Sequence, residues 1–199
     1  RVAVVPGHFP GRGAADRPLS EEVSTVQKSL EQLKQIELAP FFDVASGDDP
    51  LAQADGLLVS HIRYRGFQGN IYATTKPISF DPQAMQQLMA LPELAPWRAA
   101  GGVTVADELG VRAVRRFYNP TEQEFNGLRI AREAFLAGND LLLLSHFALD
   151  DDWGDHFTNI NETLIFFEER YTTDATFQAL VDQAVLRILR LKLRLYGDS

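Results

Sequence analysis

The chain has 199 residues, of which 45% are hydrophobic, 23% are charged and none is cysteine. This length and composition predict one globular domain over residues 1–199. The net charge of -8 argues against nucleic acid as a partner. The absence of cysteine excludes a disulfide framework, a thiolate metal site and a cysteine nucleophile. The longest apolar runs are far shorter than the roughly 20 residues of a membrane span.

The chain begins at Arg1, directly before an apolar run, without the pattern of a signal peptide. We therefore expect that processing or truncation has removed a preceding segment. The compartment stays open between the cytoplasm and an extracytoplasmic location in a bacterium.

Short apolar runs rich in Val, Leu and Ile recur along the chain, and each is followed by a turn and a segment of helical period. Parallel strands require such crossover segments, so the pattern predicts an α/β protein. The expected strands are residues 2–6, 56–62, 102–106 and 140–147.

Helical spacing of apolar residues predicts helices over residues 20–38, 82–91, 121–138 and 177–195. Ser20, Asp81 and Thr121 are the expected N-terminal caps. The last helix has a basic face, which favours an outer helix with a solvated cationic side over an element lying on a membrane surface.

Residues 150–155 contain four aspartates and resemble the beginning of a calcium loop. They lack the ligand spacing and the terminal Glu of such a loop, so we expect an acidic solvated loop instead.

Four strands are half the number that a closed (β/α) barrel needs. A parallel sheet of four strands would also expose two edges. We therefore expect an upstream segment or a partner chain to cover the open edge.

Polar residues follow the expected strands at their carboxyl ends, where parallel α/β sheets collect their chemistry. His8 and Arg12 lie in a glycine-rich loop after the first strand, and Asp107 follows the third. His61 and Tyr64 follow the second strand, and His146 lies near the end of the fourth.

Residues 8–13, HFPGRG, with Asp16 after them, resemble the KHFPGHG segment and acid/base loop of the β-N-acetylhexosaminidase branch of glycoside hydrolase family 3. Further segments resemble family motifs in the same order, among them the motif VISDDLGM. These segments are residues 33–42, 58–61, 77–82, 103–110, 134–144 and 184–192.

The resemblance implies that this chain is the carboxyl-terminal half of a (β/α)8 barrel, four βα units in length. It implies a retaining glycosidase for β-linked N-acetylglucosamine-type sugars, with Asp107 as the nucleophile. Glu108 matches the second acid of the motif, and we expect it to be structural. The alternative for Asp107 is a carboxylate that caps the following helix.

The chain departs from the family pattern in its acid/base loop. Asp16 fits the Asp of the family's Asp-x-His pair, but Pro18 occupies the His position and cannot transfer a proton. Gly7 stands where the family has a sugar-binding Lys, and Arg12 replaces a His. We expect Asp107 and Asp16 to be catalytic, without a cofactor or metal, and the following residues to bind substrate: His8, Arg12, His61, Tyr64 and His146.

Two alternatives remain open beside a glycosidase. The first is a catalytically impaired family member that binds sugar or acts as a scaffold domain. The second is a metal-dependent hydrolase, since imidazole and carboxylate groups suit Zn or Mn. Its ligands would be His8, His61, Asp107 and His146.

Overall fold

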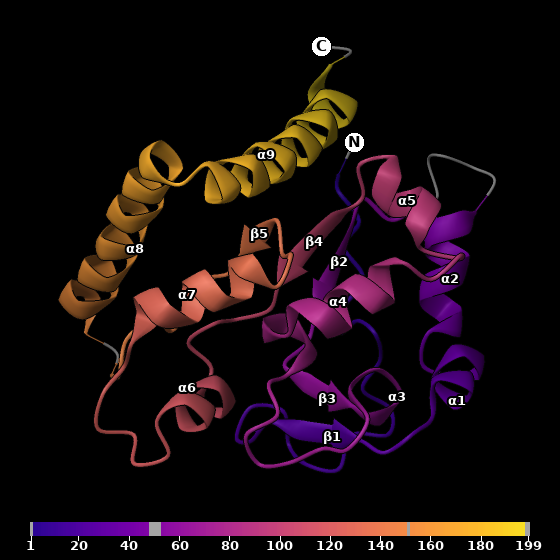
Figure 1. Cartoon of the computed structure of the whole chain (residues 1–199), viewed down its shortest axis with the longest axis horizontal. Helices are drawn as coiled ribbons and strands as arrows, with labels where there is room; N and C mark the ends of the chain where they lie inside the picture. The colour runs from indigo at the N-terminus through magenta and orange to yellow at the C-terminus, as the bar shows by residue number, and fades with distance from the viewer. Residues whose placement is uncertain (1, 48–52, 151, 198–199) are drawn as a thin grey trace.

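A computed structural model of the chain describes residues 2–47, 53–150 and 152–197 (Figure 1). Strands, helices and one 3-10 helix, η1, follow one another in this order: β1 (Ser24–Val26), α1 (Leu30–Gln35), α2 (Ala39–Ser46), β2 (Gly56–Val59), β3 (Ile62–Tyr64), α3 (Arg65–Gln68), η1 (Ile78–Phe80), α4 (Pro82–Met89), α5 (Ala95–Ala99), β4 (Val103–Ala106), α6 (Arg112–Tyr118), α7 (Gly127–Leu136), β5 (Leu141–Leu142), α8 (Trp153–Thr173) and α9 (Ala175–Tyr196).

The main sheet is parallel and pairs its strands in the order β2-β4-β5. The segment before it runs along the free edge of β2, because Leu58 N–H donates to Pro6 O at 3.0 Å and Phe9 N–H donates to Leu58 O at 2.7 Å. Neighbours in the sheet therefore follow one another in the chain. The predicted α/β class with parallel strands is confirmed.

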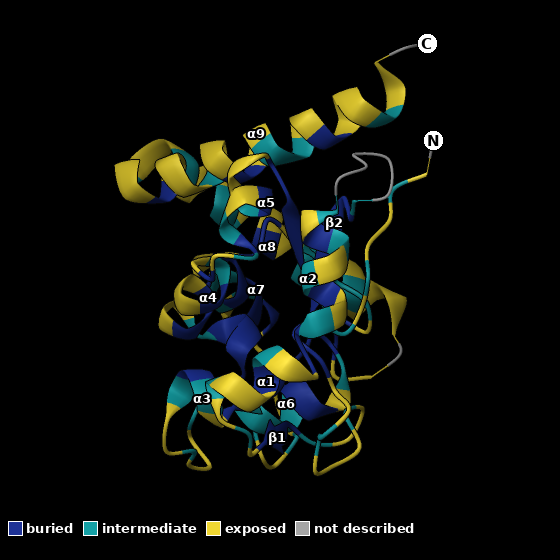
Figure 2. Ribbon diagram, turned by 90° about the vertical axis from the view of Figure 1, so that its right-hand side faces the viewer, coloured by how far each residue is buried: buried dark blue, intermediate teal, exposed yellow. Residues whose placement is uncertain are grey.

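Helices cover both faces of the main sheet, which explains why its strands are apolar on both sides. Leu191 of α9 packs on Val103 and Val105 of β4. Leu57 of β2 belongs to a larger core that includes Leu88 of α4. Figure 2 shows the buried residues between the helices, with the outer side of α9 exposed.

A second parallel pair, β1-β3, lies at the opposite end of the molecule from α9 (Figures 1 and 2). β3 follows β2 after only two residues, so the expected strand 56–62 is in fact two short strands in different sheets. The β1-β3 pair therefore lies beyond the carboxyl end of β2.

The predicted helix 20–38 is confirmed only over Leu30–Gln35, which form α1, and is wrong elsewhere. Residues 24–26 form β1, because they pair with residues 62–64, a long-range contact that local helical spacing does not reveal. The helix α1 begins only after Ser29, which forms a reciprocal capping box with Gln32. Ser20 therefore caps no helix.

Other boundaries also differ from expectation. Residues 2–6 do not form a regular strand, although their backbone forms hydrogen bonds with β2. The expected strand 140–147 is limited to Leu141–Leu142. Asn126, rather than Thr121, caps α7 by accepting from Arg129 N–H. The predicted cap Asp81 of α4 is confirmed, since its side chain accepts from Gln83 and Ala84 N–H.

The acidic segment near residue 150 begins a helix that the sequence analysis missed. Asp152 accepts hydrogen bonds from Gly154 N–H at 2.8 Å and Asp155 N–H at 3.1 Å, and so caps α8. Residue 151 lies outside the described part of the chain. Asp152, expected in a solvated acidic loop, is thus exposed and caps a helix.

The predicted carboxyl-terminal helix is confirmed as α9, but its basic face is only partly solvated. Arg187 pairs with the buried carboxylate of Asp140 at 2.8 Å. Within the described residues, no helix combines the length and apolar character that crossing a bilayer requires.

Asp140 joins β5 to α5 and α9. Its side chain is 1% exposed and accepts from Arg98, from Arg187 Nε at 2.9 Å and from the backbone N–H of Thr104 at 2.9 Å. A buried carboxylate needs such partners to offset the free energy of desolvation. This cluster lies at the amino ends of the strands, away from the polar residues that follow them.

We expect Asp140→Ala to lower the free energy of unfolding by about 3–5 kcal/mol, because it leaves two partly buried guanidinium groups without their carboxylate. Urea denaturation followed by circular dichroism measures this change. The exposed Asp43 of α2 provides the control, and Asp43→Ala should change the free energy by less than about 0.5 kcal/mol. Equal effects of the two substitutions would contradict the role of Asp140.

Candidate active site

A cavity of about 480 Å³ opens at the carboxyl ends of β2 and β4. Its position follows from the parallel register, which brings the residues after both strands to one edge of the sheet. It is lined by His8, Arg12, Leu19, Ser20, His61, Asp107, Glu108 and Val111. Four expected site residues, His8, Arg12, His61 and Asp107, therefore share one cavity.

Asp107 lies in this cavity directly after β4, and its backbone N–H continues the sheet by donating to Val59 O at 3.1 Å. Its Oδ1 accepts from Glu108 N–H at 2.9 Å, and its Oδ2 accepts from His8 Nδ1 at 3.1 Å. Its side chain is 20% exposed. The carboxylate is thus oriented by two donors and still faces the cavity.

The alternative role of Asp107 as a helix cap is wrong. The next helix, α6, begins at Arg112 after Val111, and no side chain caps it. The only backbone donor that its carboxylate accepts from, within the described residues, is Glu108 N–H.

His61 lies at the base of the cavity and is 8% exposed. Its Nε2 lies 3.1 Å from Glu108 O, which can only accept, so Nε2 carries the proton and Nδ1 accepts from Ser79 Oγ at 2.8 Å. Burial lowers the pKa of His61, opposed by the charge of Asp107, and keeps the ring neutral near pH 7. Both ring nitrogens are thus engaged within the protein.

Tyr64 holds the glycine-rich loop in place by a hydrogen bond. It is fully buried, and its hydroxyl donates to Gly11 O at 2.8 Å. Gly11 has a φ of +122°, and a Cβ there would lie 2.7 Å from the Cβ of Glu37, so only glycine fits. Burial raises the pKa of Tyr64 well above its usual range. Tyr64, expected to contact substrate, lies outside the cavity lining in this structure.

Asp16 lies in a second cavity, of about 560 Å³. Its Oδ1 accepts from Thr25 N–H at 2.7 Å and from Ser24 Oγ at 2.8 Å. Burial alone would raise the pKa of Asp16, but these hydrogen bonds outweigh it and lower the pKa below its usual value. A lowered pKa favours the ionised form, the opposite of what a proton donor requires.

The loop of residues 12–22 separates the two cavities. Arg12, Leu19 and Ser20 line the cavity of Asp107, whereas Asp16, Arg17 and Glu22 line the other.

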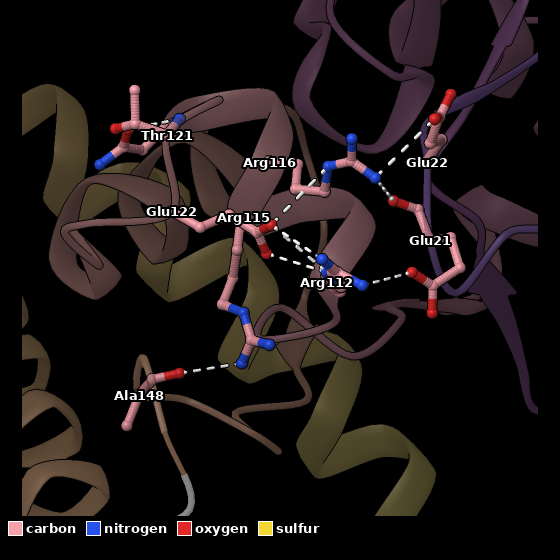
Figure 3. Close-up of polar contacts among 9 residues, drawn as sticks. Glu21, Glu22, Arg112, Arg115, Arg116, Thr121, Glu122 and Ala148 are labelled. Atoms are coloured by element: carbon pink, nitrogen blue, oxygen red, sulfur yellow. Dashed lines mark hydrogen bonds and ion pairs between the residues drawn. The ribbon is translucent and has the colours of Figure 1, made fainter.

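Helix α6 holds the end of this loop (Figure 3). Ala113 N–H donates to Ser20 O at 3.1 Å, and Arg112 pairs with Glu21 at 2.9 Å. Arg112 also pairs with Glu122 at 3.0 Å, and Arg116 lies 3.8 Å from Glu22 (Figure 3). The loop is therefore tied to α6 by a backbone hydrogen bond and by exposed ion pairs.

His146 is exposed and does not line the cavity of Asp107. In the described part of the chain, no three His, Asp or Glu side chains are arranged to hold a metal ion. Among the described residues, the expected ligands His8, His61, Asp107 and His146 therefore form no such metal site.

The sequence pattern did not indicate that Ser79, Leu19, Ser20 and Val111 belong to the site. Ser79 belongs to η1 and reaches His61 across 18 residues of chain, and Val111 precedes α6. The spacing of these residues along the sequence does not relate them to the carboxyl end of a strand. The only usable signal was the proline and glycine content of the loop that carries Leu19 and Ser20.

Comparison with known proteins places this chain in a family. The sequence profile of the glycosyl hydrolase family 3 N terminal domain matches residues 1–191. The chain belongs to glycoside hydrolase family 3. A search of curated proteins found no match.

Solved structures of the family have the same fold. A glycoside hydrolase family 3 β-N-acetylglucosaminidase from Paenibacillus sp. str. FPU-7 is 26% identical, with a TM-score of 0.72 over 100% of this chain and 32% of that one. The β-N-acetylglucosaminidase from Thermotoga maritima is 19% identical, with a TM-score of 0.64 over 96% of this chain and 34% of that one. The chain thus spans about a third of the length of these relatives.

We expect Asp16 to stabilise the fold in a pH-dependent way. Its folded-state pKa lies below the unfolded value of about 3.9, so its contribution is present above pH 4 and is lost as the pH falls through the folded value. Asp16→Asn should therefore lower the free energy of unfolding more at pH 7 than at pH 3. Urea titrations at both pH values measure this, with Asp43→Asn as the control. If Asp16→Asn lowered the free energy of unfolding equally at both pH values, the lowered pKa of Asp16 would be contradicted.

Proposed function

We propose that this chain carries the nucleophile of a retaining glycosidase that acts on β-linked N-acetylglucosamine-type sugars. The observation that carries the proposal is the Asp107 carboxylate, which faces a cavity between His8 and His61 and is oriented by Glu108 N–H and His8. Family membership supports a glycosidase. The substrate class rests on relatives described as β-N-acetylglucosaminidases.

In the proposed reaction, an oxygen of Asp107 attacks the anomeric carbon of the sugar, and the glycosidic C–O bond breaks. The leaving oxygen takes a proton from an acid, and the sugar stays bound to Asp107 as an ester. A water molecule then attacks the same carbon, gives its proton to the conjugate base of the acid that protonated the leaving oxygen, and releases both the sugar and the Asp107 carboxylate.

The residues around Asp107 suit the handling of a neutral polar ring. His8 fixes one oxygen of Asp107, and Arg12 adds guanidinium donors at the cavity wall. Such donors can hydrogen-bond sugar hydroxyl groups. His8 and Arg12 are the substrate-binding residues in this proposal, while Tyr64 and His146 lie outside the cavity lining.

A catalytically impaired sugar-binding or scaffold domain is the second candidate. It is favoured by the position of Asp16, which lines the other cavity with its carboxylate engaged by Ser24 and Thr25. Pro18 lies in the loop between the two cavities, and its side chain has no proton to donate. Loss of a general acid costs about 10²- to 10⁴-fold in rate, so both binding and slow turnover of reactive substrates are compatible with this site.

We further propose that the chain is one half of a (β/α)8 barrel, completed by an upstream segment or a partner chain. The sequential parallel order of residues 4–9, β2, β4 and β5 supports this architecture. The solved relatives contain further sequence beyond the part that matches this chain, which leaves room for the other half of a barrel.

We expect an aryl β-N-acetylglucosaminide to be hydrolysed at least about 100-fold faster than a β-linked disaccharide, because a phenolate leaves without protonation and bypasses the missing acid. Release of the phenol and of the reducing sugar measures the two rates. Equal rates would show that another residue supplies the proton.

We expect Asp107→Asn to abolish covalent labelling by a 5-fluoro-N-acetylglucosaminyl fluoride, since an amide cannot displace fluoride from the sugar. Intact mass and peptide mapping should place the label of the unsubstituted protein on Asp107. Asp43→Asn is the matched control and should label normally. Unchanged labelling of Asp107→Asn would remove Asp107 from the role of nucleophile.

A further inference from the structure

We propose that His61 is a positioning residue, which holds the Asp107 carboxylate in place through the backbone of Glu108 and is itself oriented by Ser79. The inference rests on the proposed function of Asp107 as nucleophile. It gives His61 a role different from the sugar contact expected from the sequence.

His61 has no ring nitrogen left for a ligand. Its Nε2–H donates to Glu108 O at 3.1 Å, and its Nδ1 accepts from Ser79 Oγ at 2.8 Å. The ring also stacks on Phe80, with 5.2 Å between centroids and 22° between planes. An imidazole fixed on three sides and 8% exposed supports its neighbours more readily than it binds a sugar.

Ser79 is itself held in place by a residue from another part of the fold. Asn139, which is 1% exposed, donates from Nδ2 to Ser79 O at 2.9 Å and to Ala134 O at 2.7 Å. The hydroxyl of Ser79 therefore reaches His61 from a backbone that α7 and the following turn hold in place. By donating to Nδ1, Ser79 selects the tautomer with the proton on Nε2.

Glu108 joins His61 to the carboxylate of Asp107. Glu108 receives the His61 hydrogen bond at its carbonyl and donates its own N–H to Asp107 Oδ1 at 2.9 Å. A single residue, Glu108, thus connects the imidazole to the proposed nucleophile. A shift of about 1 Å in a reacting group can cost roughly 100-fold in rate, so this connection is sufficient to control attack.

The experiment compares His61→Leu, which removes the donor at similar size, with His61→Gln, whose side-chain amide can still donate to Glu108 O. His156→Leu is the matched control, because His156 also bonds to backbone, accepting from Phe147 N–H at 3.2 Å, but does not line the cavity. Labelling by the 5-fluoro-N-acetylglucosaminyl fluoride gives a maximal rate and a half-saturating concentration for each variant.

We expect His61→Leu to lower the maximal labelling rate about 100-fold with little change in the half-saturating concentration. His61→Gln should stay within about 10-fold of the unsubstituted protein, and His156→Leu should not differ from it. A rise in the half-saturating concentration at an unchanged maximal rate would mark His61 as a sugar contact and overturn the proposal.

A second readout needs no catalysis. Amide hydrogen exchange of Glu108, measured by NMR, should accelerate at least about 10-fold in His61→Leu and in neither His61→Gln nor His156→Leu. Unchanged exchange in His61→Leu would overturn the positioning role. If the unsubstituted protein is not labelled at all, the proposed nucleophile fails, and the exchange measurement alone decides whether His61 holds Glu108.

Ser79→Ala keeps the experiment decisive if His61→Leu does not fold. It leaves the imidazole in place but removes the donor that selects its tautomer, so we expect Glu108 exchange to accelerate and labelling to slow. Normal exchange and labelling in Ser79→Ala would contradict the part assigned to Ser79.

Discussion

The candidate site depends on the parallel backbone pairing of three segments. Residues 4–9 bond to β2, and β2 pairs with β4, with Ser60 N–H donating to Phe9 O at 2.9 Å and Asp107 N–H donating to Val59 O at 3.1 Å. Because the three segments run in the same direction, the residues that follow each of them leave the sheet at the same end. His8, His61 and Asp107 meet there although about 50 residues separate each from the next.

The sequence was informative where local pattern and strand position decide the structure. Apolar runs between helical segments predicted the parallel α/β class, and the position of Asp107 after β4 predicted that it would share a crevice with His8 and His61. The helix α9 and the cap Asp81 were also predictable from spacing, because both are formed by neighbours in the chain.

The sequence was misleading where a distant partner decides the structure. Val26 has helical spacing with Leu30, yet it lies in β1 because Tyr64 pairs with it. Tyr64 follows a strand as a ligand-binding residue would, but burial and the hydrogen bond to Gly11 O give it a structural place. Asp16 lies close to Arg12 in sequence, yet the two residues line different cavities.

The loop between the two cavities sets a condition on any chemistry that uses both carboxylates. Asp16 lines the other cavity and is held there by Thr25, while the end of its loop is held by α6. The ties to α6 include exposed ion pairs, which become weaker as the salt concentration rises. A rise in ionic strength therefore loosens the end of the loop at α6, whereas Asp16 stays bound to Ser24 and Thr25 by hydrogen bonds.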